Sequence, residues 1–93
     1  MTYGKNALVT GSTSGIGRGV ARALAEHGYN IVLNGSRPAE RAEEAKQEME
    51  ENFRVKALYQ QADLRNYEEV VQMVENAAHE LKSIDILVNN AGI

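Results

Sequence analysis

Apolar residues gather in four short runs along this 93-residue chain, and each run predicts a β-strand. The runs lie near Lys5–Thr10, Ile31–Leu33, Val55–Tyr59 and Ile84–Asn89. In the first run the apolar residues are contiguous instead of alternating with polar ones, which is typical of a strand buried on both faces of a parallel sheet. The pattern therefore predicts a sheet that other elements cover on both sides.

Between these runs, apolar residues recur at the three- and four-residue spacing of an amphipathic helix. The spacing predicts helices from about Ile16 to His27, from Pro38 at a first helical position to about Asn52, and from an N-cap at Asn66 to about Leu81. Glu69 follows Asn66 at the distance of a capping box. The residues expected to face the sheet are Ile16, Val20, Ala23, Leu24 and His27 in the first helix, Ala39, Ala42, Ala45 and Met49 in the second, and Val70, Val74, Ala77, Ala78 and Leu81 in the third.

The alternating order of strands and helices predicts an α/β fold with a parallel sheet. Right-handed crossovers place the first two helices on one face of that sheet. If the third connection returns to the far side of the first strand, the third helix covers the opposite face and the strand order is 3-2-1-4. Ligands of such sheets bind in the crevice where the order reverses, between strands one and four.

A glycine-rich loop joins the first strand to the first helix, with the sequence Thr10-Gly11-Ser12-Thr13-Ser14-Gly15-Ile16-Gly17. Glycines let the backbone turn tightly and approach a phosphate, and the helix start offers free N–H groups and the positive end of its dipole. The three hydroxyls between the first two glycines are candidate phosphate or ribose ligands. No Gly-Lys-Ser/Thr follows, so the loop is not a Walker A motif. The alternative is a strand-to-helix turn without a ligand.

Composition narrows the function classes without choosing one. Hydrophobic residues make up 43% and charged residues 25% of the chain, which is ordinary for a globular protein. The net charge of −3 gives no sign of nucleic-acid or membrane-surface binding. There is no cysteine, no metal-ligand cluster, no apolar run long enough to span a membrane and no signal-peptide core at the start, so we expect a cytoplasmic protein.

Three motifs together resemble the classical short-chain dehydrogenase/reductase family. The loop from Thr10 to Gly17 resembles its cofactor loop, Ala62-Asp63-Leu64 its adenine-contact segment, and Asn89-Asn90-Ala91-Gly92 its motif at the end of the fourth strand. The motifs agree in order and spacing. The resemblance covers essentially the whole chain but only the first part of the family. It implies that residues 1–93 are the N-terminal part of a single dinucleotide-binding Rossmann domain.

The resemblance also implies a set of cofactor-binding residues. Glycines of the loop would shape the pyrophosphate site, Asp63 would accept a hydrogen bond from the adenine amino group, and Asn89 would line the ribose side. For Asp63 the alternative role is an N-cap or turn, and for Asn89 and Asn90 it is to tie neighbouring loops together. The full predicted set is Gly11, Ser14, Gly15, Ile16, Gly17, Asn34, Asp63, Leu64, Asn89, Ala91 and Gly92.

The choice between NAD and NADP is made at the end of the second strand, where an acid favours NAD and a nearby arginine favours NADP. In this sequence Asn34 occupies that position, no acidic residue is present there, and Arg37 follows. Within the family the sequence most resembles members that oxidise 3-hydroxybutyrate to acetoacetate with NAD. The alternative is an NADP-dependent reductase of 3-oxoacyl groups carried on acyl carrier protein.

The family's catalytic Ser and Tyr-x-x-x-Lys have no counterpart in this sequence. The tyrosines are Tyr3, Tyr29, Tyr59 and Tyr67, and the residues four positions later are Ala7, Leu33, Asp63 and Val71. We therefore expect part of an oxidoreductase whose catalytic residues lie beyond residue 93, or else a stand-alone nucleotide-binding module without catalysis. The fourth strand would be an exposed edge, so we expect the isolated chain to form a homo-oligomer or to be swapped or partly molten.

Overall fold

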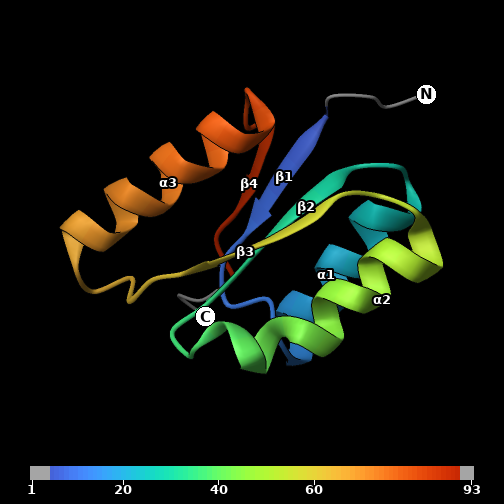
Figure 1. Ribbon diagram of the computed structural model, residues 1–93, viewed down its shortest axis with the longest axis horizontal. Helices are drawn as coiled ribbons and strands as arrows, with labels where there is room; N and C mark the ends of the chain where they lie inside the picture. The colour runs from blue at the N-terminus through green and yellow to red at the C-terminus, as the bar shows by residue number, and fades with distance from the viewer. Residues whose placement is uncertain (1–4, 91–93) are drawn as a thin grey trace.

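Four parallel strands form one sheet in the order β3-β2-β1-β4, as predicted, in the computed structural model, which describes residues 5–90 (Figure 1). The strands are β1 (Asn6–Val9), β2 (Asn30–Gly35), β3 (Ala57–Gln61) and β4 (Ile86–Val88). The helices are α1 (Gly15–Glu26), α2 (Glu43–Phe53) and α3 (Tyr67–Leu81), with a 3₁₀ turn, η1 (Ala39–Ala42), before α2.

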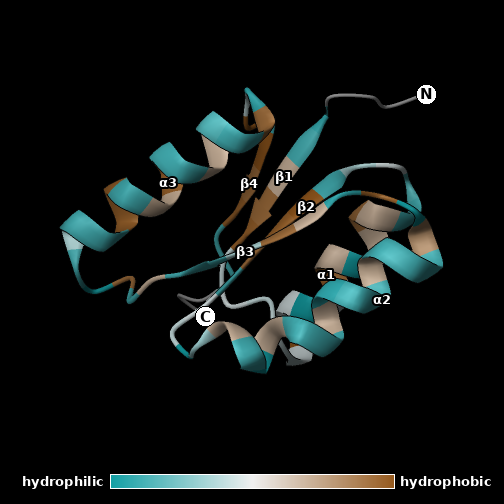
Figure 2. Ribbon diagram, viewed as in Figure 1, coloured by the Kyte–Doolittle hydropathy of each residue, from teal (hydrophilic) through white to brown (hydrophobic). Residues whose placement is uncertain are grey.

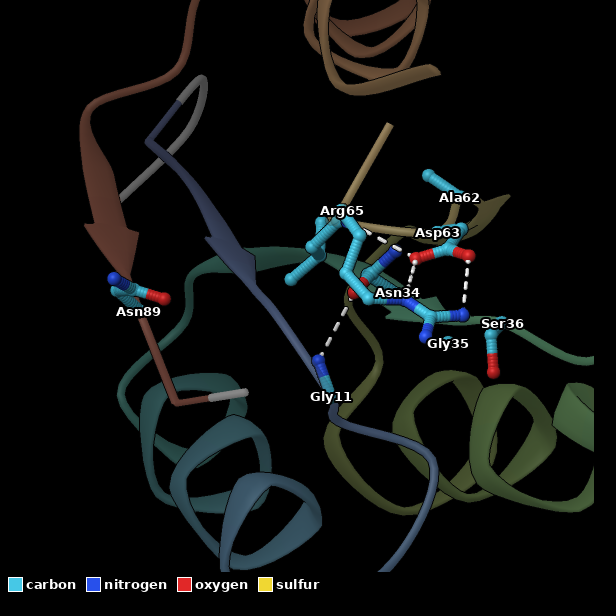
Figure 3. Close-up of a pocket in the computed structure, with 9 residues that line it drawn as sticks. Gly11, Asn34, Gly35, Ser36, Ala62, Asp63, Arg65 and Asn89 are labelled. Carbon is cyan, nitrogen blue, oxygen red and sulfur yellow. Dashed lines mark hydrogen bonds and ion pairs between the residues drawn. The ribbon is translucent and has the colours of Figure 1, made fainter. Parts of the chain in front are cut away.

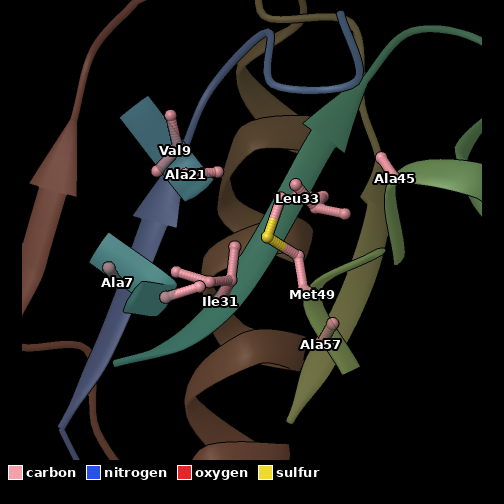
Figure 4. Close-up of a cluster of buried hydrophobic side chains, with 9 residues drawn as sticks. Ala7, Val9, Ala21, Ile31, Leu33, Ala45, Met49 and Ala57 are labelled. Atoms are coloured by element: carbon pink, nitrogen blue, oxygen red, sulfur yellow. The ribbon is translucent and has the colours of Figure 1, made fainter. Parts of the chain in front are cut away.

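Helices cover both faces of the sheet: α1 and α2 lie on one side and α3 on the other (Figure 1). The strands run through the middle as the most apolar part of the molecule (Figure 2). Alternate residues of β1 and β2 therefore enter two separate cores. The core under α1 and α2 contains Ala7, Val9, Ala21, Ala25, Ile31, Leu33, Ala45, Met49 and Ala57 (Figure 4). The core under α3 contains Leu8, Val32, Ala62, Met73, Ala77 and Leu81.

The face that α1 turns to the sheet differs from the predicted one. Gly17, Ala21 and Ala25 are the buried residues of this helix, while Ile16 is 72% exposed. Ala23 and His27 are exposed as well, and Val20 and Leu24 are half-buried. The buried positions carry small side chains, which lets the helix axis approach the strands closely. Size, not hydrophobicity, thus selects the face of α1.

The second helix was expected to start at Pro38, but the chain first forms the 3₁₀ turn η1. Pro38 caps this turn with an extended backbone (ψ 159°), and its carbonyl accepts from Arg41 N at 2.9 Å. Ala39 is consequently exposed, whereas Ala42, Ala45 and Met49 are buried as predicted.

The charged face of α2 is partly tied to α1. Arg18 donates to Glu44 at 3.0 Å and to Glu48 at 3.1 Å, and Arg22 also pairs with Glu48. The hydrogen bond to Glu44 is the largest cause of a raised pKa of Arg18; burial opposes it, and Glu48 adds to the increase. The ion pairs fix α2 beside α1 and occupy the guanidinium of Arg18.

The predicted N-cap of α3 is confirmed, but the capping box does not close. The Asn66 side-chain oxygen accepts from Glu68 N at 3.0 Å and from Glu69 N at 3.3 Å. The Glu69 carboxylate instead accepts from Asp63 N at 2.9 Å. Glu69 thus secures the segment before α3. Of the predicted core residues of α3, Val74 is 41% exposed, and Met73 is buried in its place.

Replacing Asn66 by alanine removes the acceptor for two backbone N–H groups at the start of α3. We expect Asn66→Ala to lower the free energy of unfolding by about 1 kcal/mol, the usual effect of losing such a cap. Urea denaturation measures this change. Asn66→Ser, which keeps an acceptor oxygen, serves as the matched control and should lose at most half as much; an equal loss would contradict the assigned cap.

Two strand ends differ from the prediction in ways that concern the site. β2 continues through Asn34 and Gly35, beyond the strand predicted at Ile31–Leu33, because both pair with β3. β4 is only three residues long and lies at the sheet edge, where Leu87 is 62% exposed. Within residues 5–90 no helix has the length and apolar character to span a membrane.

Candidate functional site

A cavity of about 450 Å³ opens at the carboxyl ends of the strands. Residues following all four strands contribute to its wall, as expected for the crevice of a parallel sheet. Its lining consists of Gly11, Asn34, Gly35, Ser36, Ala62, Asp63, Leu64, Arg65 and Asn89 (Figure 3). Five residues of the predicted cofactor-binding set are among them: Gly11, Asn34, Asp63, Leu64 and Asn89.

The remaining predicted residues of the set lie elsewhere. Ser14, Gly15, Ile16 and Gly17 form the cap and first turn of α1, outside the cavity lining. Ala91 and Gly92 lie outside the described residues. The predicted residues that the structure describes therefore lie in two neighbouring places, the cavity wall and the start of α1.

The glycines of the loop have different structural roles. Gly11 and Gly15 both have φ of 60°, a conformation that favours glycine. A Cβ on Gly17 would lie 2.2 Å from the Gly11 carbonyl oxygen and 2.6 Å from Asn90 Nδ2, whereas a Cβ on Gly15 would meet nothing within 4 Å. Gly17 thus permits close packing inside the protein, and Gly15 faces open space.

Ser12 is not available as a phosphate ligand, contrary to the expectation for the three loop hydroxyls. Its side chain is buried, with Oγ donating to the Val9 carbonyl at 2.6 Å and accepting from Asn34 N at 2.9 Å. Its backbone N–H donates to the Asn34 carbonyl at 2.8 Å. Ser14, in contrast, is exposed and extended at the N-cap of α1, and its side chain makes no capping bond.

Asn34 lines the cavity, but its side-chain amide is used within the protein. Oδ1 accepts from Gly11 N at 3.0 Å, and Nδ2 donates to the Gln60 carbonyl at 3.1 Å. The residue is 1% exposed. Asn34 therefore joins the start of the glycine loop to β3 across β2.

Asp63 follows β3 and carries an ion pair with Arg65 at the cavity wall (Figure 3). Its Oδ1 accepts from Arg65 N and Nε, both at 3.0 Å, and its Oδ2 accepts from Arg65 Nη2 at 2.9 Å. The guanidinium hydrogen bonds, followed by the backbone one, lower the pKa of Asp63 to about 2. The carboxylate is consequently ionised at neutral pH.

Arg65 and Ser36 line the cavity but were not predicted as site residues. Arg65 stands two residues after Asp63, the spacing at which an aspartate accepts from a backbone N–H in an Asx turn. This spacing could have identified Arg65 as a site residue from the sequence. Arg37, considered for cofactor choice, is absent from the lining, and its carbonyl accepts a hydrogen bond from the Tyr59 hydroxyl.

The two asparagines after β4 behave differently. Asn89 is exposed and lines the cavity. Asn90 donates from its backbone to Thr10 Oγ1 at 3.0 Å and from Nδ2 to the Gly11 carbonyl at 3.1 Å. For Asn90 the predicted alternative role, which is to tie neighbouring loops together, is therefore confirmed.

A parallel sheet of this strand order, with a glycine loop leading into the first helix, defines a Rossmann-type α/β domain. A family profile described as short chain dehydrogenase matches residues 5–93. The chain belongs to the short-chain dehydrogenase family, as the three sequence motifs predicted.

Curated relatives include enzymes of both predicted substrate types. The chain is 46% identical to a D-beta-hydroxybutyrate dehydrogenase from Cupriavidus necator, over 100% of this chain and 35% of that protein. It is 41% identical to a 3-oxoacyl-(acyl-carrier-protein) reductase from Staphylococcus aureus, over 100% of this chain and 37% of that protein. The chain thus spans about a third of the length of these relatives.

Solved structures share the fold. L-sorbose reductase from Gluconobacter frateurii, complexed with NADPH and L-sorbose, is 38% identical with a TM-score of 0.87, over 92% of this chain and 32% of that chain. Acetoin dehydrogenase from Salmonella typhimurium is 36% identical with a TM-score of 0.85, over 96% of this chain and 36% of that chain. Both are oxidoreductases by name.

Proposed function

We propose that this chain is the NAD(P)-binding part of an oxidoreductase. The observation that carries the proposal is the position of the cavity, whose wall brings Gly11, Asp63 and Asn89 together from three of the family's motifs. The start of α1 adds backbone N–H groups beside that wall, which suits an anionic pyrophosphate.

Each part of the site is assigned to one part of the dinucleotide. Gly15, Ser14 and Ile16 contact the pyrophosphate at the start of α1, where Gly15 leaves open space. Asp63 and Leu64 contact the adenine, and Asn89 lines the ribose side; Ala91 and Gly92 are assigned to that side from the family motif alone. Gly11, Gly17 and Asn34 shape the loop. NAD is the proposed cofactor and NADP the alternative.

The proposed activity is hydride transfer between the nicotinamide and a small hydroxy or keto substrate, best matched by 3-hydroxybutyrate and acetoacetate. The 46% identity to a D-beta-hydroxybutyrate dehydrogenase supports this assignment. The alternative is an NADP-dependent 3-oxoacyl-(acyl-carrier-protein) reductase, supported by the 41% identity to such an enzyme and by the NADPH-bound structural relative. Substrate and homo-oligomeric partners stay predictions.

Binding of the dinucleotide tests the proposal directly. We expect NADH fluorescence to change on titration with the chain, and Gly15→Val to reduce the affinity at least about tenfold, because a branched side chain would fill the space left for the pyrophosphate. Gly19→Ala, also in α1 and without neighbours within 4 Å, is the control. Circular dichroism must show that the valine variant is folded, since φ near 60° strains a β-branched residue.

Unchanged affinity in a folded Gly15→Val variant would contradict the assigned loop. Parallel titration with NADPH decides the cofactor. Because the family's catalytic Ser and Tyr-x-x-x-Lys have no counterpart in these 93 residues, we expect this chain alone to bind the dinucleotide without turning over D-3-hydroxybutyrate. Reduction of NAD in the presence of D-3-hydroxybutyrate, measured with a form of the protein that carries those catalytic residues, would support the proposed substrate.

A further inference from the structure

The Asp63–Arg65 pair has more contacts than an exposed ion pair requires. Arg65 is 91% exposed at its side chain, yet its backbone N, Nε and Nη2 all donate to the Asp63 carboxylate. Exposed ion pairs contribute little to stability because water screens them and the side chains lose freedom. The pair lies in the cavity wall, so its geometry bears on what the cavity binds.

The contacts leave Asp63 with one defined free acceptor position. A carboxylate offers about four lone-pair positions on its two oxygens. Oδ1 already accepts from Arg65 N and Nε, whereas Oδ2 accepts only from Nη2. The remaining acceptor position therefore belongs to Oδ2.

The backbone of Asp63 is fixed as well. Its N–H donates to Glu69 Oε1 at 2.9 Å, and its carbonyl accepts from Asn66 N at 2.9 Å. The charged groups in contact with Asp63 are thus Arg65 and Glu69. With the backbone held by Glu69 and Asn66 and the carboxylate by Arg65, the Asp63 side chain has little freedom to leave its position in the cavity wall.

We propose that Arg65 is a positioning residue, which holds Asp63 Oδ2 ready to accept from the exocyclic amino group of a bound adenine. This inference rests on the proposed dinucleotide site and deepens it. A fixed acceptor favours adenine over hypoxanthine, which carries an oxygen in place of that amino group and would oppose one acceptor with another. Rigidity strengthens the preference because binding then orders fewer side chains.

Charge and geometry have separable consequences at this site. Arg65 neutralises the Asp63 carboxylate, which lessens its repulsion of the anionic dinucleotide whatever the base. The orienting effect, in contrast, acts only on a base with an amino group. The ratio of affinities for the two bases therefore reports positioning, and the absolute affinities report charge.

The experiment measures the dissociation constants of NAD and nicotinamide hypoxanthine dinucleotide by calorimetry for four forms of the chain: unchanged, Arg65→Gln, Arg65→Lys and Arg41→Gln. We expect Arg65→Gln to lower the adenine preference about three- to tenfold, the range expected when one side chain must be ordered on binding. Arg65→Lys should restore the affinities for both ligands but not the preference, because an ammonium lacks the planar fork. Arg41→Gln removes an exposed charge outside the cavity lining and should leave the preference unchanged.

Equal weakening of both ligands by Arg65→Gln would overturn the positioning role and leave only a charge effect. If the unchanged chain bound both dinucleotides equally well, the positioning role would also be overturned. The proposed cofactor site would still be supported, because NAD binds. Failure of both dinucleotides to bind would instead reject the proposed function itself.

A ligand-free readout checks the contact on which the inference depends. Carboxyl NMR titration should give a pKa of about 2 for Asp63 in the unchanged chain. In Arg65→Gln this pKa should rise toward the ordinary value of 3.8, since the largest cause of the shift is the Arg65 side chain. An unaltered pKa would show that Arg65 does not hold the carboxylate.

Discussion

Gly17→Ala will destabilise the chain strongly, because no space exists for one methyl group at this position. Its Cβ would lie 2.2 Å from the Gly11 carbonyl oxygen and 2.9 Å from the Gly11 carbonyl carbon. Those atoms are backbone, and Asn90 Nδ2 holds the oxygen in place at 3.1 Å. Relief requires α1 to move away from the loop. We expect the free energy of unfolding to fall by about 3 kcal/mol or more.

Thermal unfolding followed by circular dichroism measures this effect. In a domain of this size each kcal/mol shifts the melting temperature by about 4–8 °C, so we expect a drop of about 12 °C or more. Gly19→Ala is the matched control, since it lies two residues further along α1 with nothing within 4 Å of its Cβ. There the better helix propensity of alanine should stabilise the chain by about 0.4–1 kcal/mol. Similar melting temperatures for the two variants would contradict the close contact at Gly17.

The order of elements and the strand order could be predicted because both follow from local rules. Each helix buries one apolar face and β1 and β2 are buried on both faces, so the helical spacing and the contiguous apolar runs are both visible in the sequence. The strand order then follows from right-handed crossovers and from the return of the third connection. No residue-level packing is needed for either step.

The face of α1 could not be predicted from hydrophobicity because its contact residues are small. Gly17, Ala21 and Ala25 are buried, while the more apolar Ile16 is exposed. The requirement for close approach comes from the Gly11 carbonyl and Asn90, which meet Gly17 only after folding. Distant segments of the sequence therefore decide which side of α1 is inside.

In the candidate site, too, some features follow from the local sequence and others depend on contacts that form only on folding. Asp63 was predicted from its motif, but its carboxylate is held by Arg65 and its backbone N–H by Glu69, neither of which was predicted as a site residue. Ser12 and Ser14 are the same residue type two positions apart, yet one is buried and bonded while the other is exposed. The two serines differ because the backbone of the loop directs one side chain inward and the other outward, and composition does not encode this direction.

Asn34→Asp will destabilise the chain strongly at neutral pH, although it changes one NH₂ group into an oxygen. Oδ1 can still accept from Gly11 N, but the second oxygen will face the Gln60 carbonyl, which now accepts from Nδ2 at 3.1 Å. The position is 1% exposed, so the introduced charge loses its hydration without gaining a partner. We expect a loss of about 3–4 kcal/mol at pH 7, equivalent to raising the pKa of the introduced carboxyl by about 2–3 units.

The loss should shrink in acid, because the protonated carboxyl can donate to the Gln60 carbonyl as the amide did. The folded state then binds the proton more tightly than the unfolded state, whose carboxyl has a pKa of about 3.9. Stability relative to the unchanged chain therefore falls as pH rises from about 4 to about 7. Urea denaturation at both pH values measures it, and Asn34→Ala, which removes the same bonds without adding a charge, should show no such trend.

A loss of stability in Asn34→Asp that did not vary with pH would mean that the second oxygen finds another donor or reaches water.

The side-chain contacts of Asn34 also have a consequence for cofactor choice. An acid at the end of β2 favours NAD by binding the ribose hydroxyl, but at position 34 the side chain points into the protein and bonds Gly11 and Gln60. The next cavity-lining residues along the chain are Gly35 and Ser36, so in the proposed site we expect these two residues to lie nearest the adenosine ribose. Selectivity between NAD and NADP should accordingly respond to substitutions at Ser36 and not at Asn34.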